Sequence, residues 1–179
     1  MKVIEPGQDW KIAALRSAFH VHFLFGGKMN SNFFDEAFRF AQIAFDDDEI
    51  PVGAVIVKDH EIIGYGYNSK EKDHSIISHA EIKAILMAEK VLNNWRLDGC
   101  DIYVTLDPCP MCASAIKQAR IKKVFSAVSN SDQTNSKIIT QIFEKNDKIN
   151  PKVIFSTNLD AERSKKLLNS FFKTQRDKK

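Results

Sequence analysis

The sequence predicts a three-layer α/β/α sandwich built around one mostly buried, five-stranded mixed sheet. Two observations lead to this prediction. Five short runs of apolar, β-favouring residues alternate with segments whose apolar residues recur at helical spacing. In addition, 44% of the 179 residues are apolar, which is enough for one core in a single domain of ordinary size.

The beginning of the chain does not fit this alternation. Residues 13–25 are apolar, but the run is too short to span a bilayer and is interrupted by His20 and His22. This H-x-H pair has a spacing that can bind metal, although two leader histidines are the simpler interpretation. We therefore expect residues 1–28 to be an appended leader or the result of an upstream start, and residues 29–179 to form the functional domain.

Helical spacing predicts the first helix of that domain. Asn32 and Asp35 have the spacing of a capping pair, and the apolar residues that follow share one helix face: Phe34, Ala37, Phe38, Ala41 and Phe45. Residues 46–49 are all acidic. Because negative charge is unfavourable at a helix C-terminus, we expect these four residues to form an exposed loop.

A β-hairpin follows the acidic loop. Residues 52–57 are apolar and β-favouring, Asp59 and His60 form the predicted turn, and residues 61–67 form the second strand. The rest of the chain predicts a helix at 78–92, a strand at 101–106, a helix at 108–120, a strand at 123–128, a helix at 138–143, a strand at 152–156 and a final amphipathic helix at 161–175.

Charge is unevenly distributed along the chain. The net charge is +3, but residues 163–179 contain seven Lys and Arg against one Asp, so this segment carries +6 and the remainder −3. A basic tail on a mildly acidic body indicates a polyanionic partner, the alternative being a tail that is only solvated. Four further cations are expected to extend the basic surface: Lys117, Arg120, Lys122 and Lys123.

Two of the three cysteines lie in the stretch LDPCPMC, at Cys109 and Cys112. An odd cysteine count without regular spacing favours a reducing cytoplasm, so a structural disulfide is not expected. If Asp107 caps a helix with Pro108 at its first position, both thiols lie on one face of the first turn, where the helix dipole favours thiolates. Thiolates bind metals and also carry out redox chemistry, so this stretch alone leaves both open.

A second stretch, SHAEIKAI, distinguishes between these alternatives. Together with Cys109 and Cys112, His79 completes a three-residue set typical of catalytic zinc, in which water takes the fourth position. Bound zinc lowers the pKa of water from about 15.7 to about 7. Glu81 lies two residues from a ligand, close enough to move protons between that water and a leaving group.

These residues also have structural interpretations. Ser78 and Glu81 fit a capping box, in which Glu81 only accepts a backbone hydrogen bond. A closed structural zinc site would need a fourth ligand from Cys100, His60 or His74, and we expect Cys100 to be a small core residue. The joint occurrence of H-x-E and a later P-C-x-x-C favours catalysis, because this pair is the signature of zinc nucleobase deaminases.

The similarity extends beyond these two motifs. PVGAVIV from Pro51, Asn68, SHAEIKAI, DIYVTLDPCPMCASAI and the terminal LLNSFFKTQR resemble the bacterial tRNA-specific adenosine deaminases, from about residue 33 to residue 175. That family converts the wobble adenosine of an anticodon to inosine. The resemblance implies a cytidine-deaminase-like fold, a homodimer, one Zn²⁺ per active site and a tRNA anticodon stem-loop as substrate.

The resemblance also implies roles for individual residues. It implies His79, Cys109 and Cys112 as zinc ligands and Glu81 as the proton shuttle. It further implies that Asn68 hydrogen-bonds the base, that Val52 and Ala80 wall the pocket, and that the terminal helix contacts the anticodon loop through Phe171, Phe172, Lys173 and Arg176. At least one of the two phenylalanines is expected to be a core residue.

Two positions depart from the family pattern. Asp107 stands where the family usually carries Glu, a change we expect to be benign because Asp is a good helix cap. The loop at residues 128–137 replaces one that contains Lys and Gly in the family and that helps to shape the RNA side of the site. This second departure bears on the choice of substrate rather than on the chemistry.

The sequence thus predicts a cytoplasmic zinc hydrolase that deaminates adenosine to inosine at the wobble position of a tRNA anticodon loop. One alternative is a deaminase of a free base or nucleoside such as guanine or cytosine, which would share the zinc motifs without needing the basic tail. Another is a noncatalytic, zinc-stabilised RNA-binding module, which would release no ammonia. A thiol redox protein would bind no stoichiometric metal. No membrane segment is predicted.

Overall fold

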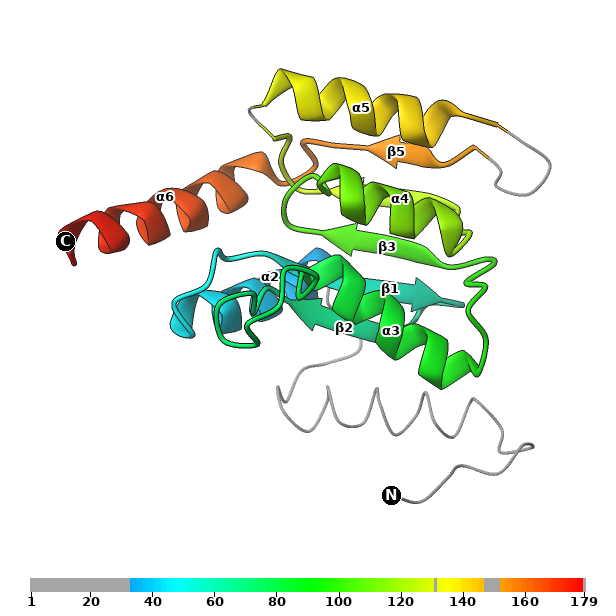
Figure 1. Cartoon of the computed structure of the whole chain (residues 1–179), viewed down its shortest axis with the longest axis horizontal. Coiled ribbons are helices and arrows are strands. Elements are labelled where there is room, and N and C mark those ends of the chain that lie inside the picture. The colour runs from blue at the N-terminus through cyan, green and yellow to red at the C-terminus, as the bar shows by residue number, and fades with distance from the viewer. Residues whose placement is uncertain (1–32, 131, 147–151, 179) are drawn as a thin grey trace, which may run out of the picture.

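The computed structural model describes residues 33–130, 132–146 and 152–178 (Figure 1). The predicted leader, with His20 and His22, lies outside the described residues. The helices and strands of the described residues are α2 (Phe33–Asp46), β1 (Gly53–Lys58), β2 (Glu61–Tyr67), α3 (Ala80–Leu92), β3 (Asp101–Val104), α4 (Pro110–Gln118), β4 (Lys123–Ser126), α5 (Gln133–Glu144), β5 (Ile154–Ser156) and α6 (Ala161–Asp177). Within this part of the chain, none of the helices has the length and hydropathy that a membrane span requires.

The strands form one mixed sheet in the order β2, β1, β3, β4, β5. β1 is antiparallel to both β2 and β3, whereas β3, β4 and β5 are parallel to one another. The hairpin turn lies at Asp59 and His60 as predicted, and both residues have positive φ. The predicted five-stranded mixed sheet is therefore confirmed.

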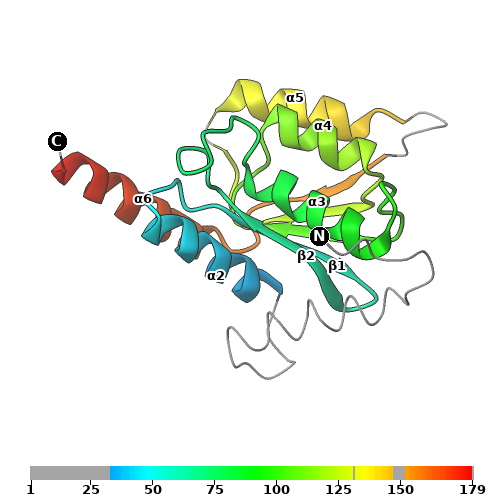
Figure 2. The ribbon, with the colours of Figure 1, turned by 60° about the horizontal axis from the view of Figure 1, so that its bottom comes forward.

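Helices cover both faces of the sheet (Figure 2). α3, α4 and α5 pack on one face, and α2 and α6 lie on the other. Two glycines allow helices to approach closely: a Cβ on Gly53 would lie 2.1 Å from the carbonyl oxygen of Ala37 in α2, and one on Gly66 would lie 2.2 Å from that of Ala80 in α3. The first residue of α3 is thus held directly against β2.

Two helices begin two residues later than the sequence predicts. α3 begins at Ala80 and α4 at Pro110, because His79 and Cys109 have extended backbones and occupy the N-cap positions. Cys109 precedes a proline, which disfavours helical geometry for that residue. The proline that opens α4 is therefore Pro110 rather than Pro108, and the prediction that Asp107 caps this helix is wrong.

Other element boundaries also differ from the predictions. The strands predicted at 101–106 and 123–128 end at Val104 and Ser126. α5 begins five residues earlier than predicted, at Gln133, because the carboxylate of Asp132 accepts hydrogen bonds from the first backbone N–H groups of the helix.

Two charged residues predicted to be exposed are buried. Glu49 of the acidic loop is 4% exposed, and its carboxylate accepts the backbone N–H of Lys72 at 2.8 Å. Lys117 is 7% exposed, and its ammonium donates to the carbonyl oxygens of Phe143 and Lys145 at the end of α5. Both expectations fail because the partners are backbone groups far away in the sequence. Cys100 is fully buried, as expected.

Candidate active site and metal centre

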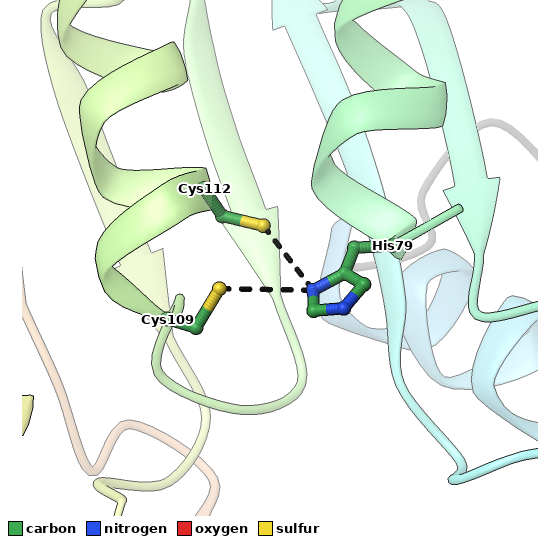
Figure 3. A group of neighbouring side chains, drawn as sticks. All are labelled: His79, Cys109 and Cys112. Atoms are coloured by element: carbon green, nitrogen blue, oxygen red, sulfur yellow. Dashed lines mark hydrogen bonds between the residues drawn. The ribbon is translucent and has the colours of Figure 1, made fainter. Parts of the chain in front are cut away.

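Three potential metal ligands meet at the beginnings of two helices (Figure 3). His79 is the N-cap of α3, Cys109 is the N-cap of α4, and Cys112 lies in the first turn of α4. The Sγ atoms of Cys109 and Cys112 lie 3.7 Å and 3.5 Å from Nδ1 of His79. The structure thus brings together the three residues that the sequence predicts as ligands, because α3 and α4 pack on the same face of the sheet.

The spacing of these atoms fits a tetrahedral zinc ion. A sulfur about 2.3 Å and a nitrogen about 2.05 Å from zinc lie about 3.6 Å apart at the tetrahedral angle. The two measured sulfur–nitrogen distances, 3.7 Å and 3.5 Å, bracket this value. Among the described residues, none of Cys100, His60 and His74 belongs to the group, so the alternative of a closed four-ligand site within the chain is not supported.

Hydrogen bonds distribute charge among the three groups. Hydrogen bonds from Cys112 and His79 lower the pKa of Cys109 to about 4. The bond to Cys109, together with burial, raises the pKa of Cys112, and the bond to Cys109 also raises the pKa of His79. One thiolate therefore lies between two proton donors. Zinc fits this donor set, because metal binding releases the protons of thiol and imidazole ligands.

Glu81 lies beside the ligands in the first turn of α3 and is 3% exposed. Burial raises the pKa of its carboxyl to about 7. The alternative of a capping box requires Ser78 at the N-cap, but His79 occupies that position and no side chain caps the helix. The structure therefore does not support a capping role for Glu81.

A cavity of about 260 Å³ opens next to the metal ligands. His79, Cys109 and Glu81 line it. The predicted pocket residues Val52 and Asn68 also line it, and the other lining residues are Asp48, Glu49, Ile50, Lys70, Glu71, Leu106, Asp107, Asn130 and Phe171. The cavity thus joins the candidate metal site to a mixed polar and apolar wall that can hold a small planar ring.

The side chain of Asn68 is held by backbone groups on both sides. Its Oδ1 accepts the N–H of Ala80 at 3.0 Å, and its Nδ2 donates to the carbonyl oxygen of Ile50 at 3.1 Å. Because an amide nitrogen carries two hydrogens, one remains to donate elsewhere. Ala80 is fully buried and does not line the cavity. Its observed contact is with Asn68 rather than with the pocket space.

The two phenylalanines of α6 have different environments. Phe171 is 5% exposed, lines the cavity and packs against Phe45 with ring centroids 5.7 Å apart. Phe172 is 47% exposed, and Lys173 and Arg176 are exposed as well. The expectation that at least one phenylalanine belongs to the core is met by Phe171, while the other three residues lie outside the cavity wall.

Two acidic residues, Asp48 of the acidic loop and Asp35 of α2, hold α6 and partly neutralise its positive charge. Gln175 donates to the carboxylate of Asp48 at 3.1 Å, and Lys178 also donates to it. Arg163 at the start of α6 pairs with Asp35 at 2.6 Å. Asp48 lines the cavity, so the acidic run that we predicted only as a loop holds α6 against the site.

Asp107 is a site residue whose role the sequence analysis missed. It is 6% exposed, accepts the hydroxyl of Thr157 at 2.7 Å and the backbone N–H of Asn130 at 3.3 Å, and lines the cavity. It thus connects the divergent loop at residues 128–137 to the start of α4. Pro110 was the signal in the sequence that could have shown this. A proline favours the first position of a helix, so Cys109 and not Asp107 is the N-cap of α4, and the Asp107 carboxylate is left for other partners.

The sheet is flanked by helices, and one nitrogen and two sulfur ligands lie at the starts of two of them, beside the buried carboxyl group of Glu81. This combination is characteristic of the zinc-dependent nucleobase deaminases. In agreement, residues 28–128 match the family described as the cytidine and deoxycytidylate deaminase zinc-binding region. The tRNA-specific adenosine deaminase of Rickettsia bellii (strain RML369-C) is 40% identical over 144 residues, which are 79% of this chain and 99% of that protein. This chain belongs to the tRNA-specific adenosine deaminase family.

Solved structures show the same fold. A structure from a study of A-to-I editing by tRNA:A34 deaminases at the wobble position of transfer RNA has a TM-score of 0.69 and 32% identity, and covers 76% of this chain and 98% of that one. The guanine deaminase of Bacillus subtilis has a lower TM-score, 0.54, at 34% identity, and covers 81% of this chain and 92% of that one. Both structures therefore share the fold of this chain.

Proposed function

We propose that this protein hydrolyses the 6-amino group of adenosine at the wobble position of a tRNA anticodon loop, giving inosine and ammonia. The observation that supports it most directly is the cavity in which His79, Cys109 and Glu81 face the same space. Membership of the tRNA-specific adenosine deaminase family supports the choice of substrate.

The chemistry requires an activated water and a group that carries protons. When bound by His79, Cys109 and Cys112, zinc supplies the Lewis acidity that lowers the pKa of water toward neutrality. Glu81 takes one proton from the water that attacks C6 of the adenine and passes it to N1, and it then carries the remaining proton of that water to the departing amino group. The water oxygen becomes the carbonyl oxygen of inosine, and the carbon–nitrogen bond breaks to release ammonia. Burial of Glu81 supports this role, because bulk solvent then competes less for the proton.

Base recognition is proposed to use the cavity wall. Asn68 is oriented by Ala80 and Ile50, so the remaining Nδ2 hydrogen donates to an acceptor on the base. Val52 supplies an apolar wall against the ring, and Ala80 contributes by fixing Asn68. Phe171 closes the cavity on the side of α6.

RNA binding outside the cavity is proposed to use the exposed end of α6. Phe172 offers a ring on which a splayed base stacks, and Lys173 and Arg176 offer phosphate contacts. Replacing both cations by Ala raises the KM for an anticodon stem-loop. Replacing the exposed Lys90 and Lys152, at the opposite end of the sheet from the cavity, leaves the KM unchanged.

We further propose a cytoplasmic homodimer whose functional domain is residues 29–179, with residues 1–28 as an appended leader. Three exposed apolar residues on and before α3 support an association surface: Ile76, Ile77 and Leu86. The three free cysteines support a reducing compartment. Sedimentation of the full chain tests the dimer, and a chain that starts at Met29 and keeps its folding and activity supports the boundary.

The decisive experiment is incubation of the zinc-loaded protein with an adenosine-containing anticodon stem-loop, followed by nucleoside analysis for inosine. Guanine, cytosine and free adenosine serve as competing substrates. Contacts to Z phosphates of a single strand give a log–log salt dependence of slope about −0.7Z, whereas a free base gives almost none. Ammonia from a free base but not from the stem-loop would overturn the proposal, and RNA binding without any ammonia would identify a noncatalytic module.

A further inference from the structure

The loop between β2 and α3 carries Asn68 at its beginning and His79 at its end, and it is closed at its base by a compact polar cluster. Ser69, Asp73 and Lys83 form this cluster, which we call the Ser69 clamp. Ser69 Oγ donates to Asp73 Oδ2 at 2.7 Å, and Lys83 Nζ donates to Ser69 Oγ at 2.6 Å and to Asp73 Oδ2 at 3.2 Å. Each member therefore contacts the other two.

The clamp is directly connected to both functional ends of the loop. Ser69 follows Asn68 in sequence, and its backbone N–H donates to the carbonyl oxygen of Ser78 at 3.1 Å, next to His79. Lys83 lies one turn into α3, and its N–H donates to the carbonyl oxygen of His79 at 3.0 Å. Displacement of the clamp would therefore move the imidazole and the Asn68 amide together.

Burial of its central hydroxyl distinguishes the clamp from an ordinary surface ion pair. Asp73 and Lys83 have side chains that are 37% and 31% exposed, and such a pair alone contributes little to stability. Ser69 is only 1% exposed, and its hydroxyl both donates and accepts within the clamp. Hydrogen bonds from Ser69, Ser78 and Lys83 hold the pKa of Asp73 at about 2, so its carboxylate stays charged at neutral pH.

We propose that Ser69, Asp73 and Lys83 are positioning residues that set the place of the metal ligand His79 and of Asn68. None of the three lines the cavity, so they act through these two residues and not on the substrate. For catalysis the proposal rests on the proposed function. For metal binding it rests only on the His79, Cys109 and Cys112 group. Groups that hydrogen-bond a metal ligand directly change metal affinity or activity by about 10-fold to 100-fold when removed. The clamp acts on His79 through the backbone, so we expect effects at the lower end of this range.

The test measures zinc affinity of the full chain by competition with a chromophoric chelator, together with kcat/KM for the stem-loop. Asp73→Ala, Lys83→Met and Ser69→Ala are each expected to weaken zinc binding about tenfold. The double variant Asp73→Ala/Lys83→Met should lose no more zinc affinity than the weaker-binding single variant, because either substitution alone already disrupts the shared cluster. Asp73→Asn keeps an oxygen for the Ser69 hydroxyl and should recover most of the affinity.

Matched controls are Asp101→Ala and Lys123→Met, which break another partly exposed ion pair of 3.7 Å at the far ends of β3 and β4. Both should bind zinc within twofold of the wild type. A clamp with a purely structural role would lower the melting temperature of Ser69→Ala without changing its zinc affinity, and this would overturn the proposal. If Asp73→Ala does not fold, Ser69→Ala decides the question, since it removes a single oxygen. A wild type that binds zinc but forms no inosine refutes only the proposed function.

Discussion

Replacement of Glu81 by Gln tests the proposed proton shuttle most directly. The amide keeps the volume of the side chain but cannot accept and return a proton. General acid–base catalysis contributes about 10² to 10⁴ in rate. We expect a loss at the upper end of this range, about 10³ to 10⁴ in kcat, because the other carboxylates that line the cavity already have partners. These pairs are Asp48 with Lys178, Glu49 with the N–H of Lys72, Glu71 with Lys70, and Asp107 with Thr157.

The assay for this variant combines single-turnover inosine formation with metal analysis and thermal unfolding. Zinc content should stay at the wild-type value, since His79, Cys109 and Cys112 are unchanged, and the melting temperature should shift by no more than about 4 °C, which corresponds to roughly 1 kcal/mol. Glu89→Gln, on the same helix but outside the cavity, is the matched control and should retain wild-type kcat. A zinc-loaded Glu81→Gln variant that deaminates within tenfold of the wild type would refute the proton-shuttle role.

Three further outcomes are expected. Lys117→Met should lower the free energy of unfolding, measured in urea, by about 1 to 3 kcal/mol, because it removes the donor to the buried carbonyl oxygen of Phe143 and to the partly buried one of Lys145. An unchanged midpoint would contradict this. Burial raises the pKa of Cys100 to about 11, so only about one Cys100 thiol in a thousand is ionised at pH 8. Mass spectrometry should therefore show that iodoacetamide leaves Cys100 unmodified in the native zinc-loaded protein at pH 8. Labelling should appear only as the pH approaches 11. Phe171→Ala should destabilise the fold by about 3 to 5 kcal/mol, because Phe171 is buried. Phe172→Ala removes an exposed ring, so it should leave stability nearly unchanged and raise the KM for the stem-loop. Equal stability losses in the two variants would contradict the assignment of Phe171 to the core and Phe172 to the RNA-binding surface.

The boundaries of the helices show where sequence reasoning loses accuracy. The sequence correctly placed Cys109 and Cys112 at the start of one helix, but it placed both in the first turn and made Asp107 the cap. In the structure Cys109 itself takes the N-cap position, as His79 does in α3. Each helix therefore begins at its metal ligand, which a propensity-based choice of cap does not anticipate.

Burial of charged residues was the least predictable feature. Glu49 was expected in an exposed acidic loop and Lys117 on a basic surface, yet both are buried. Their partners are backbone groups 23 and 26 residues away in sequence. No local pattern around either residue encodes such a contact, because it depends on how two elements pack.

The sequence by itself determined the kinds of chemical group that this protein brings to its site and their local spacing. The H-x-E and P-C-x-x-C stretches each span no more than five residues at the start of a helix, and spacing of this kind is set by backbone geometry over a few residues. Only the tertiary structure decided which separate segments meet. The packing of α3 beside α4 brings His79 within 3.7 Å of both sulfurs. Packing of α6 against Phe45 of α2 buries Phe171 rather than Phe172, and the path of the loop between β2 and α3 closes the Ser69 clamp. Such contacts depend on the burial of whole faces of helices and sheet, which is a property of the assembled core rather than of any short segment.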